Sequence, residues 1–205
     1  MNIELNLLEK SYQKKLIFQN LSAKFESGKR YGIAGHNGSG KSTLLKILAG
    51  FITPNSGTIS YSIVGNTIPV ESIYKHINYA APYLDLPVDL SFYELLNFHF
   101  SIKKRYQSLS NEAINKSLQL PSDIPIRQFS SGMLQRVKLA LAFFTESDII
   151  LLDEPTETLD EQGFLLYRHL LETYSSHRTT IIASNKEKDF IDCQSILKVS
   201  DYSNQ

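Results

Sequence analysis

Apolar and polar residues alternate in several short segments near the start of the chain. Residues 3–7 show this pattern, and residues 16–18 and 21–25 continue it. Another alternating segment, 58–63, follows a turn-forming run at residues 53–57. Because successive side chains of a strand point to opposite faces of a sheet, such alternation predicts strands with one buried face. We therefore expect a layer of half-buried strands near the N-terminus.

Other segments are apolar without alternation, which is typical of strands buried on both faces of a parallel sheet. Residues 30–34, 148–153 and 179–184 have this character. Residues 75–81 are a further strand candidate that Pro82 ends, and residues 196–199 are a candidate edge strand.

Helical spacing of apolar residues appears between these strands. Residues 43–49 and 161–175 each fit one helix. Residues 91–144 are mostly helical in pattern, with Ser91 and Ser110 as candidate N-caps and with prolines at 121 and 125 in the middle. Alternating strands and helices predict an α/β core, and the helical insertion between core strands predicts a subdomain.

The predicted architecture is a single domain spanning residues 1–205. It combines the α/β core with an antiparallel strand layer and an inserted α-helical subdomain at about residues 84–142. Lysine plus arginine and aspartate plus glutamate both number 21, so no net positive field favours nucleic acid as a partner. The lone cysteine, Cys193, indicates a reducing compartment, and no apolar run has the length of a membrane span.

The octapeptide GHNGSGKS at residues 35–42 fits the phosphate-binding pattern G-x-x-x-x-G-K-[ST]. It lies between a predicted strand and a predicted helix, which is the context that the motif requires. The candidate nucleotide-binding residues of this loop are Gly35, His36, Asn37, Gly38, Ser39, Gly40, Lys41, Ser42 and Thr43.

Each kind of group in this loop suits a phosphate. Glycines allow the backbone to approach closely, so that consecutive N–H groups point at phosphate oxygens near the positive end of a helix dipole. Lys41 adds a mobile positive charge, and the Ser42 hydroxyl can bind Mg²⁺. The imidazole of His36 is assigned no role. The loop predicts that the chain binds a nucleoside triphosphate.

A pair of carboxylates ends the buried strand at residues 148–153. Ligands of open parallel sheets bind at the carboxyl ends of the strands, where Asp153 and Glu154 are expected. Asp153 is a candidate Mg²⁺ ligand together with Ser42, and Glu154 is a candidate base that polarises an attacking water. An Asp-Glu pair after a strand is also compatible with a plain helix cap. The phosphate loop earlier in the chain favours the catalytic interpretation.

Three further motifs resemble those of a known family. Residues 129–136 (FSSGMLQR) resemble the signature motif of ATP-binding cassette (ABC) ATPases, and residues 153–156 (DEPT) resemble their second nucleotide motif. Residues 158–160 resemble the loop through which two cassettes meet. Because the motifs follow in the family's order over essentially the whole chain, we identify it as a member, and the resemblance implies a P-loop NTPase core, ATP and Mg²⁺.

The resemblance also implies roles for residues outside the phosphate loop. Tyr12 lies where the family places an aromatic ring against adenine. Ser130 and Gly132 would bind the γ-phosphate of ATP held by a second cassette, and Asp160 would lie at that contact. Two cassettes, forming a homodimer or a heterodimer, would close around two ATP molecules. A separate transmembrane permease would hold the chain at the cytoplasmic face of the membrane.

The family's permease docks in a groove that maps to residues 81–100 of this chain. Aromatic residues of this stretch would supply contact surface, although their helical spacing also suits the subdomain core. They are Tyr83, Phe92, Tyr93, Phe98 and Phe100.

Two positions depart from the family pattern. Pro82 lies where the family has a glutamine that reaches Mg²⁺ and the attacking water, so water or Asp85 would have to take its place. Asn185 stands where the family has a histidine, and its amide reaches less far and cannot carry a proton. The catalytic candidates are therefore Glu154, Lys41 and Asn185. Because of the two departures, we expect slow ATPase activity.

The expected function is that of the ATP-binding and ATP-hydrolysing subunit of an ABC transporter. One alternative is a nucleotide-gated ABC module with vestigial hydrolysis, which the residues Pro82 and Asn185 favour. Another is a soluble ABC ATPase acting on ribosomes or DNA. The chain length and the balanced charge speak against this second alternative.

Overall fold

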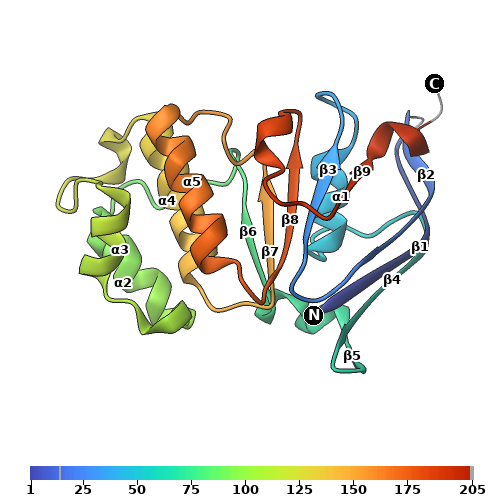
Figure 1. Cartoon of the computed structure of the whole chain (residues 1–205), viewed down its shortest axis with the longest axis horizontal. Helices are drawn as coiled ribbons and strands as arrows, with labels where there is room; N and C mark the ends of the chain where they lie inside the picture. The colour runs from blue at the N-terminus through green and yellow to red at the C-terminus, as the bar shows by residue number, and fades with distance from the viewer. Residues whose placement is uncertain (14, 204–205) are drawn as a thin grey trace.

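The computed structural model describes residues 1–13 and 15–203 as two β-sheets and surrounding helices (Figure 1). The parallel sheet has the order β6–β7–β8–β3–β9, with bounds Ile77–Ala80, Ile149–Asp153, Thr179–Ser184, Arg30–Ala34 and Ser195–Lys198. The antiparallel sheet has the order β2–β1–β4–β5, with bounds Lys15–Phe25, Asn2–Tyr12, Ser56–Ile63 and Asn66–Ile68.

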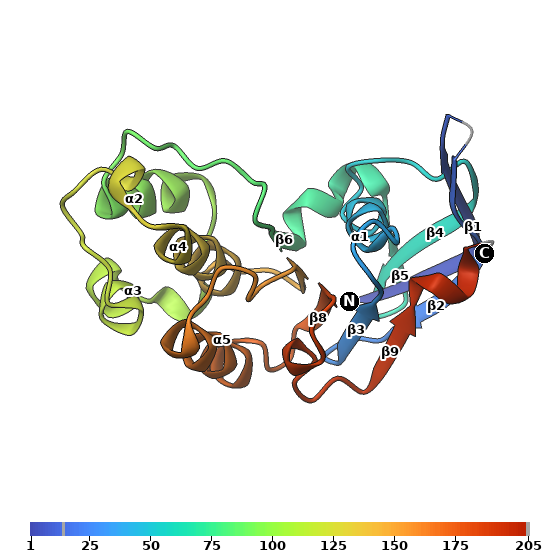
Figure 2. The same ribbon diagram turned by 90° about the horizontal axis from the view of Figure 1, so that it is seen from above.

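Helices cover both faces of the parallel sheet. The α-helices are α1 (Lys41–Leu48), α2 (Phe92–Ile102), α3 (Asn111–Leu118), α4 (Ser131–Phe144) and α5 (Glu161–Tyr174). Short 3-10 turns span Val70–Lys75, Tyr106–Ser108, Ile126–Gln128, Glu187–Asp189 and Val199–Tyr202. Figure 2 shows helices α2 to α5 gathered at one end of the molecule and the antiparallel sheet with α1 at the other.

The parallel sheet separates two hydrophobic cores. In β7, Ile149 and Leu151 pack with α1 and the antiparallel sheet, whereas Ile150 and Leu152 pack with helices α2 to α5. All four side chains are fully buried. Each contributes about 1.5–3 kcal/mol of hydrophobic stabilisation, which explains why the strand has no polar alternation.

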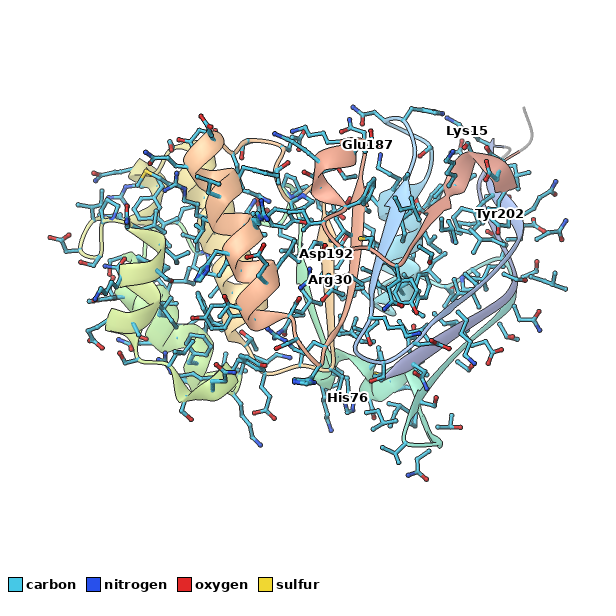
Figure 3. All side chains as sticks on the ribbon, in the orientation of Figure 1. Lys15, Arg30, His76, Glu187, Asp192 and Tyr202 are labelled. Atoms are coloured by element: carbon cyan, nitrogen blue, oxygen red, sulfur yellow. The ribbon has the colours of Figure 1, made fainter. Side chains whose placement is uncertain are left out.

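Different residues lie at the two ends of the strands in the parallel sheet. Figure 3 shows Glu187 at one of these ends and His76 at the other. Glu187 follows the carboxyl end of β8, whereas His76 precedes β6 and contacts Asp148 before β7, with its Nδ1 2.7 Å from the carboxylate. The phosphate loop, Asp153 and Glu154 therefore lie at the same end of the sheet as Glu187, which is the carboxyl end of the strands.

The predicted fold class, an α/β core with an antiparallel strand layer and inserted helices, is confirmed. Ser91 forms a complete capping box at the start of α2, and Ser110 caps α3. The helical stretch is divided into three helices, because Gln119 ends α3 in a left-handed conformation and the following prolines prevent its continuation. The segment 75–81 is a strand only over Ile77–Ala80, after a 3-10 turn. Within the described residues, no helix is both long and apolar enough to span a membrane.

Candidate nucleotide-binding and hydrolysis site

Lys41 is the centre of the phosphate loop. The structure places it as the first residue of α1, with a side chain that is only 5% exposed. Its ammonium donates to the carbonyl oxygens of Gly35 at 2.9 Å and His36 at 3.2 Å. It also lies 3.1 Å from the Glu154 carboxylate. The loop therefore wraps around a buried cation, and the predicted base lies beside it.

Two positions of the loop exclude larger side chains. Gly40 has a φ of 104°, and a Cβ there would approach the Ile17 side chain to 2.3 Å. A Cβ at Gly35 would collide with the Ser39 hydroxyl, 2.3 Å away. That hydroxyl is buried and has no hydrogen-bond partner among the described residues. An unpaired buried donor in a loop of this shape fits a phosphate oxygen as its acceptor.

Glu154 is held in a strained backbone conformation beside this loop. Its φ is 44°, and its backbone N–H donates to the Ala183 carbonyl of the neighbouring strand at 2.8 Å. One carboxylate oxygen faces Lys41. The other is 3.2 Å from the Ser184 hydroxyl and accepts from the Asn185 backbone N–H at 3.3 Å. Such strain at an ordered carboxylate is typical of functional sites.

The structure places Asn185 beside the phosphate loop. Its amide nitrogen donates to the Asn37 side-chain oxygen at 2.9 Å. Beneath it, the Ser184 hydroxyl is 2.6 Å from the buried carboxylate of Asp189, which also accepts from Thr156 at 2.6 Å. This buried hydroxyl–carboxylate cluster fixes the end of β8, and with it Asn185.

Asp153 is almost completely buried at the end of β7. One carboxylate oxygen, Oδ2, accepts from the Tyr83 hydroxyl at 2.8 Å and lies 3.2 Å from the Tyr79 hydroxyl. The other, Oδ1, is buried without a hydrogen-bond partner among the described residues. A buried carboxylate oxygen left unpaired suits a hard cation or its water ligands, so the donor set of Asp153 and Ser42 fits Mg²⁺.

The two tyrosines are residues that sequence reasoning missed at this site. Tyr83 follows Pro82, where the sequence pointed to water or Asp85 as a replacement for glutamine. Asp85 instead lines a neighbouring groove. In the sequence they appear only as two tyrosines four residues apart, near the end of a predicted strand. That spacing by itself does not indicate a site.

That groove lies between the parallel sheet and α2, with a volume of about 380 Å³. Its walls include Phe51, Tyr74, Tyr79, Leu84, Asp85, His99, Lys103 and Lys138. Of the aromatic residues at 81–100, Phe92 is fully buried, and Tyr93 and Phe100 pack against the subdomain core. Tyr83 and Phe98 are exposed by about half.

The signature segment forms a second half-site at the start of α4. Ser130 is the N-cap and accepts from the Met133 backbone at 3.3 Å. A Cβ at Gly132 would lie 3.2 Å from the Thr158 carbonyl, so this helix start packs closely on the loop after β7. Asp160 caps α5 and forms an ion pair of 3.0 Å with Arg136. Within the described residues, the side chains of Lys41 and Glu154 form no hydrogen bond or ion pair with this half-site.

Tyr12 lies at the end of β1, in register with Lys15 of β2. Its ring is 47% exposed, and the Lys10 ammonium lies 5.2 Å from the ring centroid. Further along β2, Ile17 packs against Gly40. The β1–β2 hairpin thus approaches the phosphate loop and presents an accessible aromatic ring on the same strand pair.

Comparisons with known proteins identify the family of the chain. A family model described as ABC transporter matches residues 18–157. The uncharacterized ABC transporter ATP-binding protein YybJ of Bacillus subtilis (strain 168) is 32% identical over 208 residues, covering 92% of this chain and 88% of the relative. The lantibiotic transport ATP-binding protein SrtF of Streptococcus pyogenes is 30% identical, covering 89% of this chain and 79% of the relative.

Solved structures share the fold. A putative ABC transporter ATP-binding protein from Pyrococcus furiosus has a TM-score of 0.84 and 24% identity, and each chain is covered completely. A dimeric ATP-binding cassette in a post-hydrolysis state, bound to ADP and Pi, has a TM-score of 0.80 and 22% identity, covering 96% of this chain and 93% of that one. The chain therefore belongs to the ABC transporter family, in which it is an ATP-binding subunit.

Proposed function

We propose that this chain hydrolyses ATP in a closed pair of cassettes and thereby drives a separate transmembrane permease. The observation that carries this proposal is the position of Glu154, whose carboxylate lies 3.1 Å from the Lys41 ammonium. Glu154, the candidate base for the attacking water, thus lies beside Lys41, the cation that would bind phosphate. The phosphate loop brings the nucleotide to that point.

Binding would begin with the phosphates. Backbone N–H groups of residues 37–43 and the Lys41 ammonium would hold them, and the exposed Tyr12 ring would stack on adenine. Phosphate oxygens would compete with Glu154 for Lys41, which would release the carboxylate to meet water. Ser42 and Asp153 would hold Mg²⁺, which neutralises charge on the phosphate oxygens when bound.

Glu154 would then orient the attacking water. Its second carboxylate oxygen accepts from the Asn185 backbone N–H while the first faces Lys41, so the carboxylate is held at both oxygens before the nucleotide binds. The Asn185 side-chain amide, which donates to Asn37, would turn to donate to the γ-phosphate. Loss of one preorganised donor to developing charge typically costs about 10²–10³ in rate. Because asparagine only partly replaces the longer histidine and Pro82 offers no side-chain group, we expect slow turnover.

A second cassette would complete the site. Ser130 and Gly132 lie at a helix start with a positive dipole end, and within the described residues the side chains of Lys41 and Glu154 form no hydrogen bond or ion pair with it. This separation supports head-to-tail closure, in which each signature helix meets the ATP of the other subunit. The dimeric neighbour solved with ADP and Pi lends further support. The second cassette would be an identical or a different chain.

The groove beside α2 is the proposed permease-docking site. Phe51, Leu84 and Tyr74 give it an apolar wall, and Lys103 and Lys138 give it positive charge at the rim. Several curated relatives are named as transport or export ATP-binding proteins, among them SrtF. Docking there would place the chain at the cytoplasmic face of the membrane.

The direct test is steady-state ATP turnover of the purified chain beside a Glu154→Gln variant. The amide keeps the shape and one acceptor but cannot take a proton, so turnover should fall by about 10²-fold or more. Light scattering with ATP would report dimerisation of both proteins. If both are equally inactive yet dimerise, hydrolysis by this chain is refuted, and an ATP-gated clamp takes its place.

A further inference from the structure

Two tyrosine hydroxyls meet the carboxylate of Asp153 from the groove side of the sheet. Tyr83 donates to Oδ2 at 2.8 Å, Tyr79 lies 3.2 Å from the same oxygen, and the two hydroxyls contact each other. Because Tyr83 makes the shorter contact with the carboxylate, one arrangement of the two hydroxyl protons gives a hydrogen bond to each acceptor. Tyr79 donates to Tyr83, and Tyr83 donates to Asp153.

Both hydroxyls remain donors at neutral pH. A phenol ordinarily ionises only at about pH 10, so each hydroxyl keeps its proton. The rings are also held in place. The Phe51 ring packs edge-on against Tyr79, with centroids 5.5 Å apart, and the Lys46 ammonium lies 4.5 Å from the Tyr83 ring centroid.

The loop that carries Tyr83 is fixed from the opposite side. The Lys138 ammonium of α4 donates to the Pro82 carbonyl. Pro82 itself has no donor or acceptor in its side chain and its N–H is absent. The loop therefore reaches Asp153 through its next residue, Tyr83.

The carboxylate is thus anchored through one oxygen and free at the other. Oδ2 accepts from Tyr83 and has the Tyr79 hydroxyl 3.2 Å away, whereas Oδ1 is buried without a partner among the described residues. If the carboxylate rotated, its free oxygen Oδ1 would no longer point in one fixed direction. Groups that hydrogen-bond a metal-binding carboxylate orient it, and their removal typically costs about 10–100-fold in metal affinity or activity.

We infer that Tyr83, supported by Tyr79, is a positioning residue that orients Asp153 for Mg²⁺ and replaces the side chain that Pro82 lacks. The inference rests on the proposed function only in taking Mg²⁺–ATP as the ligand. Tyr79 also lines the groove, so the hydroxyl pair lies between the groove and the metal site. The two hydroxyls contact Asp153 and each other, so their effect acts through Asp153.

The test measures metal binding without hydrolysis. Mn²⁺ would be titrated into the chain with a non-hydrolysable ATP analogue, and bound Mn²⁺ would be read by electron paramagnetic resonance. Tyr83→Phe removes only the hydroxyl and should weaken Mn²⁺ binding about 10-fold. Affinity for the analogue without metal and the urea midpoint should change little. Tyr202→Phe, in the 3-10 turn Val199–Tyr202 and assigned to no proposed site, is the matched control and should behave as wild type.

A double variant separates positioning from simple packing. Tyr79→Phe should weaken Mn²⁺ binding less than Tyr83→Phe, and it should add little in the Tyr83→Phe background, because Tyr79 acts through Tyr83. Unchanged Mn²⁺ affinity in Tyr83→Phe would overturn the inference. Absent turnover in wild type would refute the proposed hydrolysis and leave this measurement intact, since it requires only nucleotide binding.

Discussion

Acidification should weaken this fold through one histidine in particular. His99 lies near the end of α2, with Nε2 2.7 Å from the Thr145 hydroxyl. That hydroxyl donates its proton to the Leu141 carbonyl at 2.6 Å, so His99 must be the donor and carries its proton on Nε2. Protonation at Nδ1 would place a positive charge in the groove wall, beside the edge of the Phe100 ring.

Burial, followed by the positive charges of Lys103 and Arg105, lowers the pKa of His99 from 6.5 to about 4. The unfolded chain therefore binds a proton at a higher pH than the folded one. The stabilising contribution is present above pH 6.5 and is lost as pH falls towards 4. Linkage gives a loss of about 2 kcal/mol near pH 5, and partial solvent exposure of the ring reduces it to about 1–2 kcal/mol.

The measurement is urea unfolding of wild type and His99→Gln, each near pH 7.5 and near pH 5. Glutamine keeps a donor for Thr145 but does not titrate. Other groups facing the groove, among them Asp85 and Lys138, are common to both proteins, so their contribution cancels in the difference. Wild type should lose about 1–2 kcal/mol more than the variant on acidification.

Equal losses in the two proteins would refute the reasoning, because they would show that His99 titrates alike in the folded and unfolded chain. A larger loss in His99→Gln would reverse the predicted sign. Either result would mean that the ring is hydrated in the folded protein.

Two further predictions concern other parts of the chain. Arg178→Met should lower the free energy of unfolding by about 3 kcal/mol, because the guanidinium donates to the carbonyls of Phe143, Thr145 and Tyr174 at the ends of α4 and α5. An unchanged urea midpoint would contradict this. Asn185→His should raise ATP turnover about 10-fold by restoring a longer donor, as measured by phosphate release, and no rise would show that this position does not meet the γ-phosphate.

Much of the fold and site was predictable because the determining interactions are local. The glycines and Lys41 of the phosphate loop act within a few residues of one another, as do the caps at Ser91 and Ser110. The fully apolar run of β7 required burial on both faces, and hence helices on both sides of a parallel sheet. Because ligands bind at the carboxyl ends of strands in open parallel sheets, the position of Asp153 and Glu154 after this strand predicted that they would lie near the nucleotide.

Tertiary structure alone decided what surrounds Asp153. Tyr79 and Tyr83 precede it by 74 and 70 residues, and they meet it because β6 pairs in parallel with β7. Hydrophobic periodicity shows that a strand is buried, but it does not show which strand lies beside it or in which register. Those follow from the packing of the whole sheet, and so the sequence identified the carboxylate while the fold supplied the hydroxyls that hold it.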